Sequence, residues 1–155
     1  MKVFISHKNE DALVALQVCN ALKSAGADSY LDVLDNNIAQ DGEKLTKHIR
    51  EKLRECTEII VVLSSRTKTS WWVPFEIGMA AEKDMPIVNY LTSEETLPSY
   101  LSYWPRLKTL QDISKYVAAR RKVANETRTL YESTYHADSR KSETERFYAE
   151  LKKNL

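Results

Sequence analysis

Short segments rich in apolar residues alternate along the chain with longer segments in which apolar residues recur every three or four positions. The short segments are residues 3–5, 29–33, 59–63, 85–91 and 107–110. Their length and composition predict strands, and the third is apolar throughout, as expected of a central strand covered on both faces. Five strands in alternation with helices predict an α/β fold, built on a doubly wound parallel sheet with right-handed crossovers.

The longer segments predict helices with one face on the sheet. In the first, expected over residues 12–23, that face consists of Ala12, Leu13, Leu16, Cys19 and Leu22. In the second, expected from Glu43, it consists of Leu45, Ile49, Leu53 and Cys56. A third helix is expected from the first turn at Pro74 to about Asp84, and a fourth from Asp112. Asn9 suits the N-cap of the first helix, and Gly26 suits its end.

The 155 residues are enough for one hydrophobic core. We expect residues 1–125 to form the α/β domain and residues 126–155 to form a C-terminal helical extension packed on the same domain. Within the extension, Phe147, Tyr148 and Leu151 share one helical face. A second stripe consists of Leu130, Tyr131, Thr134 and Tyr135.

Composition narrows the function classes. The formal net charge is +1 and no sustained basic run is present, so the sequence gives no reason to expect nucleic acid or an anionic membrane surface as a partner. No apolar segment approaches the roughly 20 residues that span a bilayer, and we expect a cytoplasmic protein. Cys19 and Cys56 lack a C-x-x-C partner and are expected to be reduced thiols, and no metal site is expected.

The stretch after the central strand carries the candidate chemistry. It begins at Ser64, at the carboxyl end of that strand, where ligands bind in open α/β sheets. Glu76 is expected in the first turn of the following helix, beside Trp71 and Trp72. A carboxylate beside large aromatic rings suits a site for a flat ligand, with Trp72 expected on the ligand side by its spacing to Glu76. The alternative is that Glu76 only complements the helix dipole and that one tryptophan belongs to the core.

The glycine count excludes one class of nucleotide enzyme. The chain holds only Gly26, Gly42 and Gly78, so it cannot form the G-x-G-x-x-G loop that cradles a pyrophosphate. This argues against a dehydrogenase.

Several motifs together resemble those of the Toll/interleukin-1 receptor (TIR) domain family. They are Val3-Phe4-Ile5-Ser6-His7, Tyr30-Leu31-Asp32-Val33, Asp41-Gly42 before a helix, and Ser70-Trp71-Trp72-Val73-Pro74-Phe75-Glu76-Ile77-Gly78, in this order over about residues 2–125. The most specific piece is Trp72-x-x-x-Glu76. Residues 39–42 depart from the family's small-residue-Gly pattern. The resemblance implies a flavodoxin-like, three-layer α/β/α fold with a five-stranded parallel sheet.

The resemblance also implies an activity, because many bacterial and plant members cleave NAD+. The family's catalytic glutamate corresponds to Glu76, which makes an NAD+ nucleosidase or ADP-ribosyl cyclase the expected enzyme. By the same correspondence, the substrate-binding residues are expected to be Phe4, Ser6, His7, Lys8 and Asp35. NAD+ is then the substrate, and no cofactor is implied.

The domain makes up most of the chain, which further resembles the stand-alone TIR proteins of bacterial Thoeris anti-phage systems. Those proteins make a cyclic or conjugated ADP-ribose signal for a separate effector protein. The family also implies self-association through TIR–TIR contacts, either weak or triggered by ligand.

Cleavage between ribose C1′ and nicotinamide needs only one carboxylate, because nicotinamide leaves as a neutral ring while the sugar becomes oxocarbenium-like. Glu76 can stabilise that cation, hold a ribose hydroxyl or form a covalent adduct, and the sequence leaves all three open. Two other functions also stay open: a non-catalytic TIR interaction or adaptor module that docks through residues 34–42, and a nucleoside deoxyribosyltransferase-like enzyme.

Overall fold

The computed structural model describes residues 1–31, 41–93, 96, 98–131 and 139–155. Its strands are β1 (Lys2–Ser6), β2 (Asp28–Leu31), β3 (Glu58–Leu63), β4 (Ile87–Leu91) and β5 (Arg106–Leu107). Its α-helices are α1 (Ala12–Ser24), α3 (Gly42–Glu55), α4 (Trp72–Glu82), α5 (Leu110–Tyr131) and α6 (Ser139–Asn154). Three 3-10 turns complete the described part: η1 (Asn9–Asp11), η2 (Ser65–Thr69) and η3 (Ser99–Tyr103).

The five strands form one parallel sheet in the order β2-β1-β3-β4-β5. This is the flavodoxin-like order, and it confirms the predicted fold class. The central strand β3 is buried along its whole length, as its continuous apolar sequence predicted. Because all strands are parallel, β1 and β3 end at the same edge, where the order of connections reverses and ligands bind in this fold.

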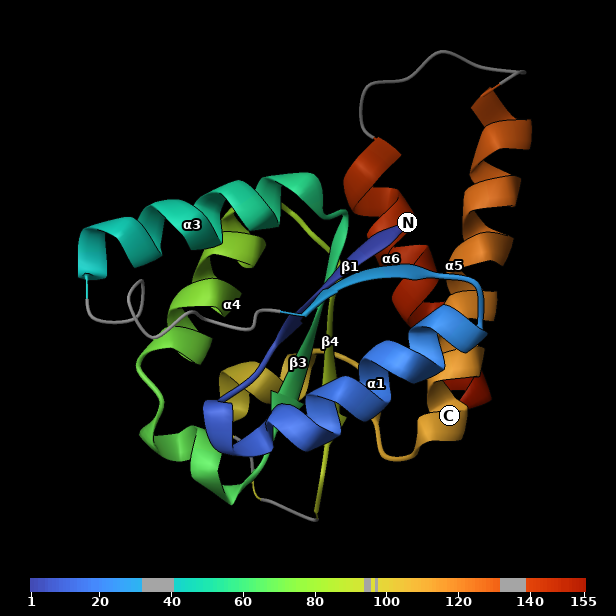
Figure 1. The fold of residues 1–155 in the computed structure, drawn as a ribbon. Coiled ribbons are helices and arrows are strands. Elements are labelled where there is room, and N and C mark those ends of the chain that lie inside the picture. The colour runs from blue at the N-terminus through green and yellow to red at the C-terminus, as the bar shows by residue number, and fades with distance from the viewer. Residues whose placement is uncertain (32–40, 94–95, 97, 132–138) are drawn as a thin grey trace.

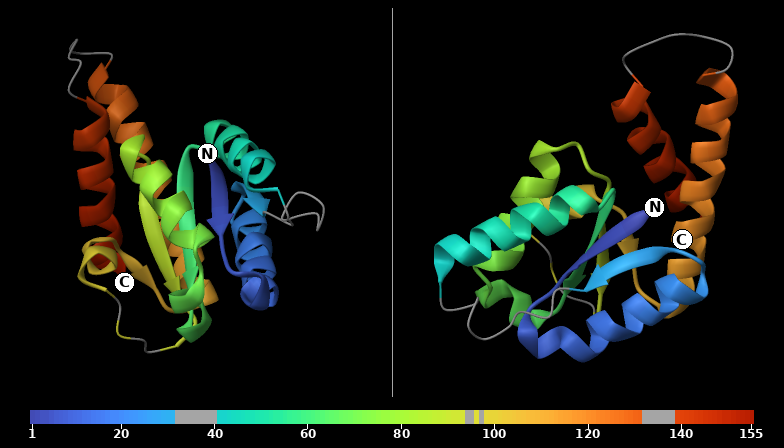
Figure 2. Two further views of the ribbon diagram at one scale, coloured as in Figure 1. Left: turned by 90° about the vertical axis from the view of Figure 1, so that its left-hand side faces the viewer. Right: turned by 45° about the horizontal axis from the view of Figure 1, so that its top comes forward.

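Helices cover both faces of the sheet (Figure 1). One face of the sheet packs against α1, α5 and α6 through a core that includes Val3, Ile60, Val88 and Phe147. The other face packs against α3 and α4 through a core that includes Phe4, Ile59, Leu45 and Ile77. The α5 and α6 helices lie side by side in both views of Figure 2. The boundary expected at residue 125 falls inside α5, so no break in the chain separates the α/β domain from the start of the extension.

Helix α1 shows one prediction that was wrong. The structure buries Ala15, Val18 and Leu22, whereas Leu13 is 79% exposed and Leu16 is 45% exposed. The segment is apolar on more than one side, so helical periodicity alone did not fix which stripe faces the sheet. The expected cap at Asn9 is also absent, because residues 9–11 form the η1 turn and the helix begins at Ala12.

The other helices match their predictions more closely. Leu45, Ile49, Leu53 and Cys56 are buried, as predicted for α3. Phe147 and Leu151 are fully buried in α6, and Tyr148 packs beside them. Helix α5 begins at Leu110, two residues before the predicted start, and β5 is correspondingly shorter than residues 107–110. Residues 32–40 and 132–138, which include the end of the predicted second strand, lie outside the described residues.

Candidate active site

Glu76 is a buried carboxylate near the carboxyl ends of β1 and β3. Its side chain accepts a hydrogen bond from the hydroxyl of Ser6, the last residue of β1. Both residues are shielded from solvent, with exposed fractions of 5% for Glu76 and 1% for Ser6. Helix α4 begins at Trp72, so Glu76 lies in the second turn of the helix. The prediction that placed it in the first turn was wrong. Its burial beside β1 cannot be explained by the helix dipole alone, which acts within the first turn.

A cavity of about 260 Å³ opens at Glu76. Residues 7–10, after β1, form one wall, and residues 69–72, before and at the start of α4, form the other. A larger hollow of about 700 Å³ lies at the opposite edge of the sheet, lined by residues that include Leu53, Met85 and Arg120. We place the candidate site at the smaller cavity, because it combines a buried carboxylate with the strand edge at which this fold binds ligands.

The two tryptophans play different structural roles. Trp71 is 90% exposed, whereas the Trp72 ring packs edge-on against Phe75 at a centroid distance of 5.7 Å and contacts the core. Both line the cavity. Trp72 therefore lines the cavity and also joins the core, whereas Trp71 has the larger exposed surface.

His7 and Lys8 line the cavity and are held by neighbouring groups. His7 Nδ1 lies 3.3 Å from the carbonyl oxygen of Ile5, which can only accept, so Nδ1 carries the proton in this contact. Lys8 Nζ donates to Thr69 Oγ1 at 2.8 Å and pairs with Glu10 Oε1 at 3.0 Å. The hydrogen bond from Lys8 lowers the pKa of the Glu10 carboxyl.

Among the expected substrate-binding residues that the structure describes, Phe4 and Ser6 do not line the cavity. The Phe4 side chain is fully buried in the core under α3 and α4, with its ring 5.6 Å from that of Tyr30. As a middle residue of β1, Phe4 points to the face opposite Val3 and Ile5 and has no surface left for a ligand. Asp35 lies outside the described residues.

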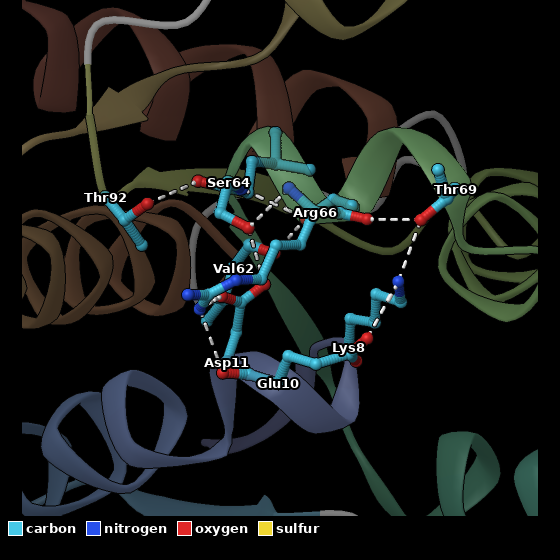
Figure 3. A network of polar contacts seen from close by, with 10 residues as sticks. Lys8, Glu10, Asp11, Val62, Ser64, Arg66, Thr69 and Thr92 are labelled. Carbon is cyan, nitrogen blue, oxygen red and sulfur yellow. Dashed lines mark hydrogen bonds and ion pairs between the residues drawn. The ribbon is translucent and has the colours of Figure 1, made fainter.

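A polar network joins the two loops that form the cavity walls (Figure 3). The carboxylate of Asp11, only 3% exposed, accepts a hydrogen bond from Ser64 Oγ at 2.6 Å and lies 3.5 Å from Arg66 Nη1. The same Arg66 nitrogen donates to the Glu10 carbonyl oxygen at 3.2 Å. Sequence reasoning missed this contact between the loops. The available signal was that Asp11 and Ser64 both follow strands that end at one edge.

Metal ligands are not clustered in the part of the chain that the structure describes, where no group of three or more His, Cys, Asp or Glu residues is placed to hold an ion. Among the described helices, none combines the length and apolar character required to cross a membrane.

Comparisons with known proteins agree with this architecture. A family model described as "TIR domain" matches residues 3–130. A Bacillus cereus (strain MSX-D12) protein described as "Probable 3' cyclic ADP-D-ribose synthase ThsB'" is 28% identical over 80 residues, which are 49% of this chain and 41% of that protein. The chain therefore matches less than half the length of this curated relative.

Two solved structures share the fold. The TIR domain of the Toll-related receptor TRR-2 from Hydra magnipapillata has a TM-score of 0.56 and 17% identity, covering 67% of this chain and 82% of that one. A 2-deoxyribosyltransferase from Bacillus psychrosaccharolyticus has a TM-score of 0.61 and 10% identity, covering 74% of this chain and 90% of that one. At these identities, the likeness concerns the fold alone.

Proposed function

The chain belongs to the TIR domain family, and from this premise we propose that it cleaves NAD+ between ribose C1′ and nicotinamide to make an ADP-ribose-derived signal. The observation that carries the proposal is the buried Glu76 carboxylate, held by Ser6 in a cavity beside two tryptophans. The similarity to a probable 3' cyclic ADP-D-ribose synthase supports a cyclic product. The proposal includes a role in bacterial anti-phage immunity with a separate effector protein, which follows from the resemblance to stand-alone TIR proteins.

The proposed reaction mainly requires a negative charge near the anomeric carbon. When the C1′–N bond breaks, its electron pair moves to the pyridinium nitrogen, so nicotinamide leaves as a neutral molecule. The ribose then carries an oxocarbenium-like charge, which a fixed carboxylate stabilises. Glu76 is withdrawn from solvent, and Coulombic attraction is stronger there than in water. An oxygen nucleophile, either water or a group of the same ADP-ribose, completes the reaction.

The other residues of the site are proposed to bind and orient the substrate. The hydroxyl of Ser6 fixes the Glu76 carboxylate, because a hydrogen bond to one of its oxygens restricts its rotation. Trp71 and Trp72 offer aromatic faces for a planar ring of the dinucleotide. The cavity is smaller than the roughly 300–1,000 Å³ typical of small-molecule sites. We therefore include self-association through TIR–TIR contacts in the proposal, with a neighbouring copy contributing to the site.

The replacement Glu76→Gln tests the proposal directly. It keeps the size of the side chain but removes the charge, so we expect NAD+ cleavage to fall by at least about 10²- to 10³-fold if the carboxylate stabilises the transition state. Release of nicotinamide is measured by liquid chromatography, and mass spectrometry identifies the ADP-ribose product. The far-ultraviolet circular dichroism spectrum should be unchanged.

The matched control is Glu82→Gln, which removes an exposed carboxylate from the far end of the same helix. Its activity should equal that of the unmodified protein. Full activity of the Glu76→Gln variant would remove Glu76 from the mechanism. No cleavage of NAD+ by the unmodified protein would favour the interaction-module alternative. Cleavage of deoxynucleosides in a parallel assay would favour the deoxyribosyltransferase alternative.

A further inference from the structure

The ion pair between Lys8 and Glu10 lies at the candidate active site and has no role in the chemistry described above. We propose that Lys8, held in position by Thr69, forms a phosphate subsite, that Glu10 occupies it as a displaceable counter-charge, and that the cavity thereby selects nucleotides over uncharged or cationic nucleosides. The inference rests on the proposed function and names the substrate class of the same site.

The geometry places one positive charge between the two cavity walls. Lys8 Nζ lies 2.8 Å from Thr69 Oγ1 on the opposite wall and 3.0 Å from Glu10 Oε1 on its own wall. Figure 3 shows the Lys8 side chain extending from the first loop toward Thr69. All three residues line the cavity that contains Glu76. The Thr69 hydroxyl donates its own proton to the Arg66 carbonyl oxygen at 3.0 Å and so presents its oxygen to Lys8. A phosphate that enters this cavity therefore meets an ammonium group that is already in place.

The backbone that carries Glu10 is held by hydrogen bonds, while its side chain is half exposed to solvent. The Glu10 carbonyl oxygen accepts a hydrogen bond from Arg66 at 3.2 Å, and the next residue, Asp11, bonds to Ser64. The Glu10 side chain is 51% exposed, and solvent screens an ion pair this exposed, so the pair adds little stability. Displacing the Glu10 carboxylate from Lys8 therefore costs little, and the backbone around it need not move.

The charge balance favours an anionic ligand. The diphosphate of NAD+ carries two negative charges and replaces the single negative charge of Glu10 beside Lys8, which binds phosphate as a point charge. Nicotinamide riboside has no phosphate and carries a positive charge, so it gains nothing from Lys8. For this nucleoside, Glu10 is an attractive group and not a competitor.

Kinetics of the Glu10→Gln variant test whether Glu10 has opposite effects on the binding of NAD+ and of nicotinamide riboside. We expect KM for NAD+ to fall about two- to fivefold with kcat unchanged, which is the size expected for an exposed ion pair. KM for nicotinamide riboside should stay constant or rise. Lys8→Gln should raise KM for NAD+, and Glu10→Gln should have a smaller effect in the Lys8→Gln background. Glu82→Gln serves as the charge-matched control and should change neither KM.

A binding measurement separates this inference from the proposed function. Calorimetry measures the binding of inorganic pyrophosphate to the subsite in the absence of catalysis. The affinity for pyrophosphate should rise in the Glu10→Gln variant and fall in the Lys8→Gln variant. If NAD+ is cleaved but Glu10→Gln changes neither KM nor pyrophosphate affinity, the subsite is refuted and the activity stands. If pyrophosphate binding shifts as expected but NAD+ is not cleaved, the subsite stands and the proposed activity is refuted.

Discussion

At the scale of single residues, one contact between Ser6 and Glu76 determines the environment of the candidate catalytic carboxylate. The two residues lie on β1 and α4, 70 positions apart in the chain, and their hydrogen bond turns an acidic helix residue into a fixed, buried carboxylate. Gly78, two positions further along α4, shows the opposite case. It is exposed, and a Cβ at this position would meet nothing within 4 Å, so no packing contact in the described structure requires a glycine.

Gly78→Ala should therefore stabilise the protein. The backbone is helical at this position, and alanine restricts the unfolded chain more than glycine does, so we expect a gain of about 0.5–1 kcal/mol in the free energy of unfolding. Urea denaturation followed by circular dichroism measures the change. A loss of stability would contradict this prediction and would show that α4 requires a glycine at this position, although the observed packing does not explain why.

Helix boundaries and helix faces are decided at the scale of elements. For α1, the choice of face depended on which stripe fitted the sheet, because both candidate stripes were apolar. For α5, the start depended on Asp112, whose side chain accepts hydrogen bonds from the backbone N–H groups of Lys108 and Thr109. Burial alone would raise the pKa of the Asp112 carboxyl, but Lys115 and these backbone donors outweigh it and lower the pKa to about 2.

This shift predicts a pH-dependent contribution of Asp112 to stability. Because the folded-state pKa of about 2 lies below the ordinary value of 3.8, the ionised group stabilises the fold above pH 4. The contribution, roughly 2 kcal/mol, is lost as the pH falls from 4 through 2. Asp112→Asn should therefore cost about 1–2 kcal/mol at pH 7 and almost nothing near pH 2.

Denaturant unfolding of both proteins across this pH range measures the difference. Glu126→Gln, an exposed substitution on the same helix, is the control and should stay within about 0.5 kcal/mol. A difference between Asp112→Asn and the unmodified protein that did not depend on pH would contradict the electrostatic explanation.

At the scale of the whole molecule, a buried polar cluster joins the central strand to the C-terminal helices. Glu58 in β3 is 1% exposed and accepts hydrogen bonds from Tyr116 and Arg120 of α5. Arg120 also pairs with Glu143 of α6 at 3.1 Å and lies over the Phe147 ring. Burial and the charge of Glu58 raise the pKa of Tyr116 well above its ordinary value, so its hydroxyl stays protonated and donates.

Arg120→Ala should destabilise the whole fold. It removes the cation that offsets the buried Glu58 carboxylate, and breaking a buried pair in this way costs about 3–5 kcal/mol. Lys122→Ala, which removes an exposed partner of Glu150 from the same helix, should cost much less, because solvent screens that ion pair. Thermal and urea unfolding compare the two variants. If both variants lost the same free energy of unfolding, the buried cluster around Glu58 would contribute no more to stability than an exposed ion pair.

The sequence determined the fold class and pointed to the edge of the sheet at which the candidate site lies. Hydrophobic periodicity depends on local geometry, so the five strands, the buried face of α3 and the polar loop after β3 were predictable from the chain alone. The position of Glu76 after the central strand followed from the same pattern, because parallel strands bring their carboxyl ends to one edge.

Only the tertiary structure decided contacts between residues distant in the chain. It placed Phe4 in the core, joined Asp11 to Ser64, paired Lys8 with Thr69, and fixed the face that α1 buries. Periodicity reports that a helix or strand has an apolar side, but it carries no information on which partner will meet that side. Hydrogen bonds between loops depend on the relative positions of two strands, and those positions exist only after the sheet has formed.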